Sequence, residues 1–214
     1  MTITHHPDVA TLMSYAAGSL AEPLAAVVAS HAAICPQCRS EIARMEAVGA
    51  ALFAALGPSE CVRPAPLNSL RRAECDVEPA PEKTVSGDVP SPLVKLIGPH
   101  LRDIAWKRLG FGIWHLPLPL SPGTKGDLRL IKVAPGLMMP EHGHGGTELT
   151  LLLQGSYKDE FGHFQTGDIS DLDENAEHQP VSDPQEGCIC LIASTERAKF
   201  KGLLARIVQP LTGM

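Results

Sequence analysis

The chain has 214 residues, enough for one large domain or two small ones, and 44% of them are hydrophobic, so a buried core is feasible. Aromatic residues make up only 4%, so that core must be mostly aliphatic. The net charge of −6 argues against a protein that binds DNA directly, because contact with phosphates needs a basic surface. The opening residues lack the features of a signal peptide, and no apolar run is long enough to span a bilayer. We therefore predict a cytoplasmic protein without a membrane segment.

Residues 1–58 show three stretches with helical patterns. The first begins at Pro7, which is a favourable first helical residue, and the others cover residues 21–33 and 36–56. Three helices of this size bury little apolar area, so a domain made of them needs a further stabilising cross-link, such as a bound metal ion. The longest predicted helix carries an apolar stripe of six residues: Ile42, Met45, Val48, Ala51, Leu52 and Ala55.

A candidate for such a cross-link lies in the sequence HAAICPQC, residues 31–38. Cys35 and Cys38 have the spacing of zinc ligands, and His31 lies one helical turn before Cys35 on the same face. A fourth ligand must come from elsewhere, and we favour His6 over His5 because it directly precedes the first predicted helix. Two thiolates and two imidazoles suit Zn²⁺ in a closed tetrahedral site. The alternatives are cysteines that only fill a core, or a thioredoxin-like redox motif, although no βαβ pattern surrounds this one.

Residues 59–92 differ in composition from the residues before them. One short helix is possible around residues 67–72, where it could contact a partner or pack on its own domain, and Cys61 and Cys75 flank it as oxidation-sensitive or neutral thiols. The following residues are rich in proline and charge, which indicates an extended linker. We predict a helical domain at 1–80, a linker at 81–92, a β-domain at 93–195 and an amphipathic C-terminal helix within 196–214.

The predicted β-domain contains many short strands with turn residues between them, which favours a sandwich or a barrel. Gly155 and Gly167 are among the turn residues. Cys188 and Cys190 are two residues apart on the last predicted strand, so both side chains face the same side. We favour buried core thiols over a redox-active pair for these two residues. The C-terminal helix is expected to pack on a neighbouring element rather than on a membrane surface. The candidate strands are 112–118, 126–134, 148–154, 155–161, 168–171, 178–182 and 187–193.

A second group of donor side chains comprises His142, His144 and Glu148, all within seven residues. Proline and glycine residues just ahead of them break helices, so the two histidines are expected on extended backbone. Side chains two apart on a strand face the same way, so both imidazoles can point at one ion. Glu148 opens the next apolar strand and can join them.

The spacing of this group resembles the first cupin motif at every specified position, from Gly136 through the three donors to Gly155. Gly167 and Asp168, followed at a distance by His178, resemble the second motif, although the spacing is longer and the expected proline before the glycine is missing. The resemblance covers about residues 110–195. It implies a double-stranded β-helix barrel with His178 as the fourth ligand. Three imidazoles and one carboxylate suit Zn²⁺, Fe²⁺, Mn²⁺ or Ni²⁺.

The N-terminal half is similar to the zinc-containing anti-sigma domain, whose four ligands map to His6, His31, Cys35 and Cys38. Combined with a C-terminal cupin, it resembles the ChrR family of anti-sigma factors, and the segments ELTLLLQGSYKDEFGHFQTGD and KGLLARIVQP agree further. This resemblance spans nearly the whole chain. It implies that the helical domain binds an extracytoplasmic-function-type sigma factor, and that the cupin receives a small-molecule or reactive-oxygen signal, usually of photooxidative or other oxidative stress.

Together these observations predict a multi-domain α + β protein with an N-terminal zinc-stapled helical bundle and a C-terminal cupin barrel. We predict two zinc sites, although the cupin site could hold another divalent ion. The expected function is that of an anti-sigma factor and not of an enzyme. The alternative is a cupin metalloenzyme of the dioxygenase kind with the bundle as a docking module, because such enzymes use the same four ligands. The attached zinc bundle favours the regulator.

Overall fold

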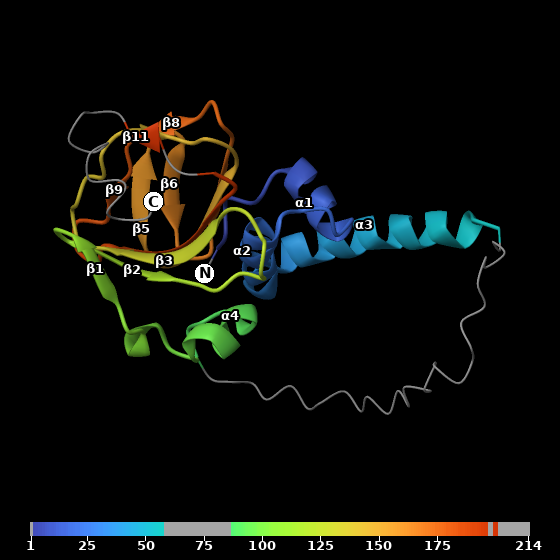
Figure 1. The fold of residues 1–214 in the computed structure, drawn as a ribbon, viewed down its shortest axis with the longest axis horizontal. Coiled ribbons are helices and arrows are strands. Elements are labelled where there is room, and N and C mark those ends of the chain that lie inside the picture. Colours follow the sequence, from blue (N-terminus) through green and yellow to red (C-terminus); the bar gives the residue numbers. More distant parts are fainter. Residues whose placement is uncertain (1, 58–86, 197–198, 201–214) are drawn as a thin grey trace.

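The computed structural model describes residues 2–57, 87–196 and 199–200, and Figure 1 shows a barrel of strands with helices packed outside it. None of the described helices combines the length and the apolarity needed to cross a membrane. The helices are α1 (Val9–Ala16), α2 (Glu22–Ile34), α3 (Pro36–Ala55) and α4 (Ser91–Ile97), and a 3-10 turn covers Leu101–Asp103. The strands are β1 (Lys107–Gly110), β2 (Ile113–Pro117), β3 (Asp127–Val133), β4 (His142–Gly143), β5 (Glu148–Asp159), β6 (Gly162–Gln165), β7 (Ile169–Leu172), β8 (Glu177–His178), β9 (Val181–Ser182), β10 (Cys188–Ser194) and β11 (Lys199–Phe200).

The described strands form two antiparallel sheets. The larger sheet has the order β1-β2-β3-β10-β5-β6, and β7 and β9 also pair with β5. The smaller sheet has the order β11-β4-β8 and lies at one end of the barrel (Figure 1). Because β5 pairs with β10, β6, β7 and β9, it is the central strand of the barrel. The many short strands expected from the sequence therefore do form a barrel.

Helix α2 packs on the outside of the barrel, against β10, β5 and β3. Its Val27 and Val28 are fully buried, and each contributes roughly 1.5–3 kcal/mol of hydrophobic stabilisation by this burial. On β10 the outward residue Leu191 belongs to the same hydrophobic cluster as α2, whereas Cys188 and Cys190 belong to a separate cluster inside the barrel. The alternation predicted for the two cysteines is confirmed. The helices and the barrel thus share one continuous core.

Helix α3 begins against this core and then extends beyond the rest of the molecule (Figure 1). Ile42, in its first half, is buried, but the apolar residues of its second half are exposed. Val48 is 61% exposed, Leu52 66% and Phe53 78%. The predicted apolar stripe therefore exists, but nothing among the described residues covers its C-terminal part.

The sequence predicted a turn at Gly155 between two strands, and this prediction is wrong. Residues 148–159 form the single strand β5, and β5 has one residue more than β10 between Leu152 and Gln154, which is a β-bulge. Gly155 follows the bulge with a φ of +73°, and a Cβ there would lie 2.0 Å from the carbonyl oxygen of Gly187. Only glycine permits this conformation and close approach, so the glycine marks a bulge rather than a turn.

Other predictions need smaller corrections. Pro7 precedes the first helix, which begins at Val9, with Asp8 at the N-cap position. Helix α4 starts at Ser91, so the limit predicted at residue 92 falls inside a helix that no periodicity had indicated. In the predicted C-terminal helix, residues 199–200 instead form β11, because their backbone pairs with the edge of β4. The rest of that helix, and the short helix predicted at residues 67–72 with its two flanking cysteines, lie outside the described residues.

Candidate metal centres

The first cluster joins the N-terminal segment to the start of α3. The four residues predicted from the sequence are together, and one ligand atom from each lies within 4.8 Å of the others: His6, His31, Cys35 and Cys38. The Sγ atom of Cys38 lies 3.3 Å from both Nδ1 of His6 and Nε2 of His31. Two sulfurs and two imidazole nitrogens in this arrangement match the donor set of a closed tetrahedral zinc site.

The local sequence explains how the two sulfurs come to face one point. Cys35 has extended backbone between α2 and α3, and Pro36 starts α3 immediately after it. Cys35 is therefore the N-cap residue, and its Sγ accepts a hydrogen bond from the backbone N–H of Cys38. The two sulfurs therefore lie on the same side of the first turn of α3.

The protonation of this cluster is set mainly by burial. Burial lowers the pKa of His31 to about 4, and the nearby His6 adds to the shift, so His31 is in the neutral form that binds metals. Burial and the neighbouring Cys35 raise the pKa of the Cys38 thiol to about 12. A buried thiolate therefore needs a cation beside it, and a divalent metal ion would supply that charge.

His5, the alternative fourth ligand, lies on the barrel instead. Its Nδ1 is 3.1 Å from a carboxylate oxygen of Asp168, and its ring lies 4.5 Å from the ring of Phe164. Because neighbouring residues of an extended segment point to opposite sides, the same segment directs His6 to the cluster. The sequence preference for His6 thus agrees with the geometry.

The second cluster lies at one end of the barrel. Ligand atoms of the four predicted residues again lie within 4.8 Å of one another: His142, His144, Glu148 and His178. His142 on β4 pairs directly with His178 on β8, and Glu148 is the first residue of β5. The three imidazole rings have centroids 4.6 to 5.3 Å apart. Extended backbone around His142 and strand pairing with β8 therefore place all three rings around one point.

The hydrogen bonds of two rings fix which nitrogen faces that point. Nδ1 of His142 donates to the carbonyl oxygen of Pro140 at 2.9 Å, and Nδ1 of His178 donates to Oδ2 of Asp159 at 2.8 Å. Their Nε2 atoms are therefore the acceptors, and they lie 3.2 Å apart. Such outer partners of metal-binding histidines are common, because they orient the ring and raise its basicity.

Burial and charge oppose each other in this cluster. Burial lowers the pKa of His142, and His178 adds to the shift. Burial alone would lower the pKa of His144 and raise that of Glu148, but their mutual contact at 3.2 Å reverses both shifts. Nε2 of His144 is buried without a hydrogen-bond partner among the described residues, which is costly unless a cation satisfies it. This donor set fits a divalent metal ion.

Comparison with known proteins identifies the family to which this architecture belongs. Residues 95–197 match the family model described as the ChrR cupin-like domain. The chain is also 36% identical over 211 residues to the anti-sigma-E factor ChrR of Cereibacter sphaeroides, an alignment that covers 98% of both proteins. The chain belongs to the ChrR family. A ChrR structure, the crystal structure of Rhodobacter sphaeroides SigE in complex with the anti-sigma ChrR, matches with a TM-score of 0.76 and 36% identity, over 90% of this chain and 100% of that chain.

In this ChrR family member the second cluster opens onto a cavity of about 380 Å³ inside the barrel. Its walls include Ile131, Val133 and Ile192 as well as Cys188 and Cys190. The two cysteines are buried free thiols. A hydrogen bond between Cys188 and Cys190, together with burial, raises the pKa of Cys190 well above its usual value. Cys190 therefore remains protonated, and the burial of both thiols fits the prediction of core thiols. His142, Glu148 and His178 also line this cavity, so the cluster and the cavity adjoin.

Two functional carboxylates were not identified from the sequence. Asp159 orients His178 from 19 positions away, and no spacing rule connects them. Asp168 was noted only as part of a glycine–aspartate turn, yet it is 1% exposed and binds the segment that carries His6. The glycine–aspartate pair itself was the one available signal. Of the remaining histidines, His163 is exposed.

Proposed function

We propose that this protein is an anti-sigma factor that binds a sigma factor of the SigE type and withholds it from RNA polymerase until an oxidative signal reaches the cupin barrel. The observation that carries the proposal is the similarity over 98% of the chain to an anti-sigma-E factor, with both donor clusters intact. The protein acts in the cytoplasm, on the sigma factor rather than on DNA, and it is not an enzyme.

The sigma factor binds through residues 1–80, and the exposed half of α3 is the main contact surface. Val48, Leu52 and Phe53 expose 61 to 78% of their surface on a helix that extends away from the core. A helix with an exposed apolar face binds in a groove or between domains of a partner, and buried aromatic anchors supply much of the affinity. The related chain that matches with a TM-score of 0.76 is in complex with SigE, which supports a sigma factor as the occupant.

The first cluster has a structural role in this proposal. Its four residues hold Zn²⁺, which fixes the N-terminal segment and α2 against the start of α3. Because the sigma-binding helices are ordered before the partner arrives, the free energy of binding is not spent on ordering them. The predicted linker then connects this domain to the cupin domain, and it ends before α4, which begins at Ser91.

The second cluster receives the signal. It combines four protein donors with a cavity of about 380 Å³, large enough for a small organic molecule or an oxidant. A divalent metal bound there would supply Lewis acidity and, if redox-active, reactivity toward oxidants. Zinc is the expected occupant. The residues of the chain orient and surround that position: Asp159 holds His178, and Ile131, Val133 and Ile192 line the cavity beside it.

A binding and release experiment tests the proposal. The full chain is mixed with its sigma factor, and complex formation is followed by size-exclusion chromatography and by inhibition of sigma-dependent transcription. We expect a stoichiometric complex that dissociates after illumination with a photosensitiser. His142→Ala should still inhibit transcription but should not release the sigma factor. A wild-type protein that binds no sigma factor would refute the proposal, and oxygen-dependent turnover of a small molecule would favour the metalloenzyme.

A further inference from the structure

The turn between β6 and β7, residues 165–168, contacts the first cluster from the barrel side. Nδ1 of His31 donates to the carbonyl oxygen of Gly167 at 3.0 Å, and both residues are buried. A carbonyl oxygen only accepts, so Nδ1 carries the proton and Nε2 presents its lone pair to the cluster. The nitrogen that faces Cys38 is thus selected by an atom of the barrel, 136 residues away in sequence.

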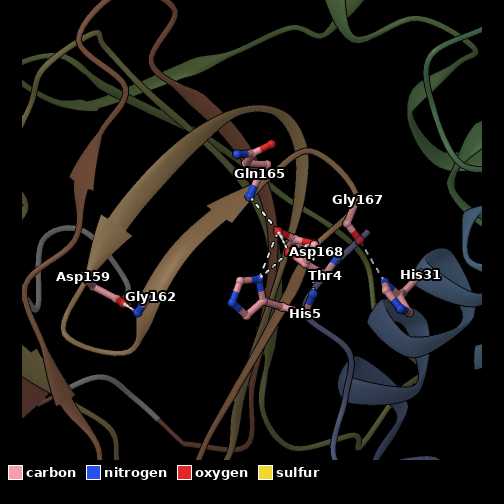
Figure 2. A network of polar contacts seen from close by, with 8 residues as sticks. All are labelled: Thr4, His5, His31, Asp159, Gly162, Gln165, Gly167 and Asp168. Carbon is pink, nitrogen blue, oxygen red and sulfur yellow. Dashed lines mark hydrogen bonds and ion pairs between the residues drawn. The ribbon is translucent and has the colours of Figure 1, made fainter. Parts of the chain in front are cut away.

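The next residue of the turn, Asp168, holds the segment that carries the other imidazole. Its carboxylate accepts the backbone N–H groups of Thr4 at 2.7 Å, His5 at 3.1 Å and Gln165 at 3.0 Å, and Nδ1 of His5 lies 3.1 Å away. Figure 2 shows the carboxylate between the N-terminal segment, at Thr4 and His5, and Gln165 of β6. The carboxylate is 1% exposed, and His6 follows directly after the residues that it binds. The backbone of the barrel also binds this segment, because the N–H of Ile169 donates a hydrogen bond to the carbonyl oxygen of His5.

These contacts are more specific than the packing of two domains requires. A buried carboxylate is costly unless several donors satisfy it, and here most of the donors come from the segment next to His6. Metal-binding histidines depend on such outer partners for ring orientation, and their loss typically lowers metal affinity about 10–100-fold. The turn therefore meets both requirements of an outer shell: it fixes one ring and immobilises the backbone of the other.

We infer that Gly167 and Asp168 are positioning residues of the N-terminal zinc cluster, so that the cupin barrel itself secures the metal that organises the sigma-binding helices. This rests on the proposed zinc at the first cluster. The opposite end of β6 reaches the second cluster. Asp159, the last residue of β5, accepts the N–H groups of Phe161 and Gly162 through Oδ1 and the Nδ1–H of His178 through Oδ2 (Figure 2 shows its bond to Gly162). A displacement of β6 would thus be felt at both metal positions.

Cobalt substitution in the full chain tests this inference. Co²⁺ bound by Cys35 and Cys38 gives a thiolate-to-metal charge-transfer band, and the second cluster has no sulfur ligand, so the band reports on the first cluster alone. Loss of the band is timed after addition of excess EDTA. We expect Asp168→Asn to lose cobalt on the order of tenfold faster than the wild type. Gly167→Ala should also lose it faster, because the φ of +94° at Gly167 disfavours a side chain and the carbonyl must move.

The matched control is Asp171→Asn. Asp171 is on β7 and also binds the helical unit, through the N–H of Asp8 at 3.0 Å and the hydroxyl of Thr11 at 2.7 Å, but these groups lie at the start of α1, and Asp171 binds neither a residue adjacent to His6 nor an imidazole of the cluster. Its rate should stay within about twofold of the wild type. Equal acceleration by both aspartate variants, or a wild-type rate for Asp168→Asn, would overturn the inference while leaving the zinc cluster in place. If Asp168→Asn does not fold, His5→Ala removes one partner of the carboxylate at a half-exposed position, and a wild-type rate there overturns the inference too. A wild-type protein without the band would overturn the cluster itself.

Discussion

Replacing Phe53 by alanine should weaken sigma binding without destabilising the free protein. Phe53 is 78% exposed on the protruding half of α3, and an aromatic side chain presents roughly 150–250 Å². Docking can therefore bury about 150 Å² of it, worth up to about 4 kcal/mol at roughly 25 cal/mol per Å². Part of that area remains with alanine, and interface area converts incompletely into affinity, so we expect a loss of about 2 kcal/mol. This corresponds to a dissociation constant about 30-fold higher.

Isothermal titration of the full chain with its sigma factor measures this change, and a thermal melt of the free variant measures stability. The matched control is Phe111→Ala, since Phe111 is 85% exposed but lies on the barrel between β1 and β2. Both variants should melt within a few degrees of the wild type, because exposed substitutions usually change stability by about 0.5 kcal/mol or less. A Phe53→Ala affinity within about threefold of the wild type, or a loss that is equally large for the control, would refute α3 as the main contact surface.

Three further changes test the clusters and the bulge. Cys35→Ser should remove metal from the first cluster and lower the melting temperature, as metal analysis and calorimetry of the full chain would show; retained zinc would contradict the ligand assignment. His178→Ala should lower metal occupancy of the second cluster by at least about tenfold while the exposed His163→Ala leaves it unchanged, and dialysis against chelator buffers distinguishes the two. Gly155→Ala should destabilise the barrel by more than about 1 kcal/mol in urea unfolding, because its φ is +73° and its Cβ would meet the Gly187 carbonyl; an unchanged midpoint would argue against the bulge geometry.

Local patterns in the sequence predicted most of the architecture. Helical periodicity placed α1, α2 and α3 to within a few residues, because each has apolar positions at helical spacing between clear breakers. The donors within each cluster were predicted from equally local spacings: His31, Cys35 and Cys38 follow one another at intervals of four and three residues, and His142 and His144 lie two apart on extended backbone. Where the prediction was wrong, tertiary pairing decided: residues 199–200 joined the edge of β4 rather than a helix.

Gly155 illustrates how a correct residue can carry a wrong interpretation. A glycine between two apolar runs predicts a turn, and the same glycine equally permits a bulge in a continuous strand. Only the position of β10, whose Gly187 carbonyl comes within reach of the missing side chain, distinguishes the two cases. Helix α3 illustrates the converse, because its apolar stripe was predicted correctly, but its length beyond the core, and hence its exposure, could not be.

The sequence by itself determined that this chain joins a helical unit with a CxxC–histidine cluster to a cupin barrel with a second donor set, because both patterns depend on spacings within a few residues. The tertiary structure alone decided what surrounds those donors. It directed His6 to the cluster and His5 to Asp168, and it brought Asp159 to His178. These contacts join segments that are up to 164 residues apart. The fold, and no local rule, sets their geometry, since they form only once segments that are distant in the sequence have packed together.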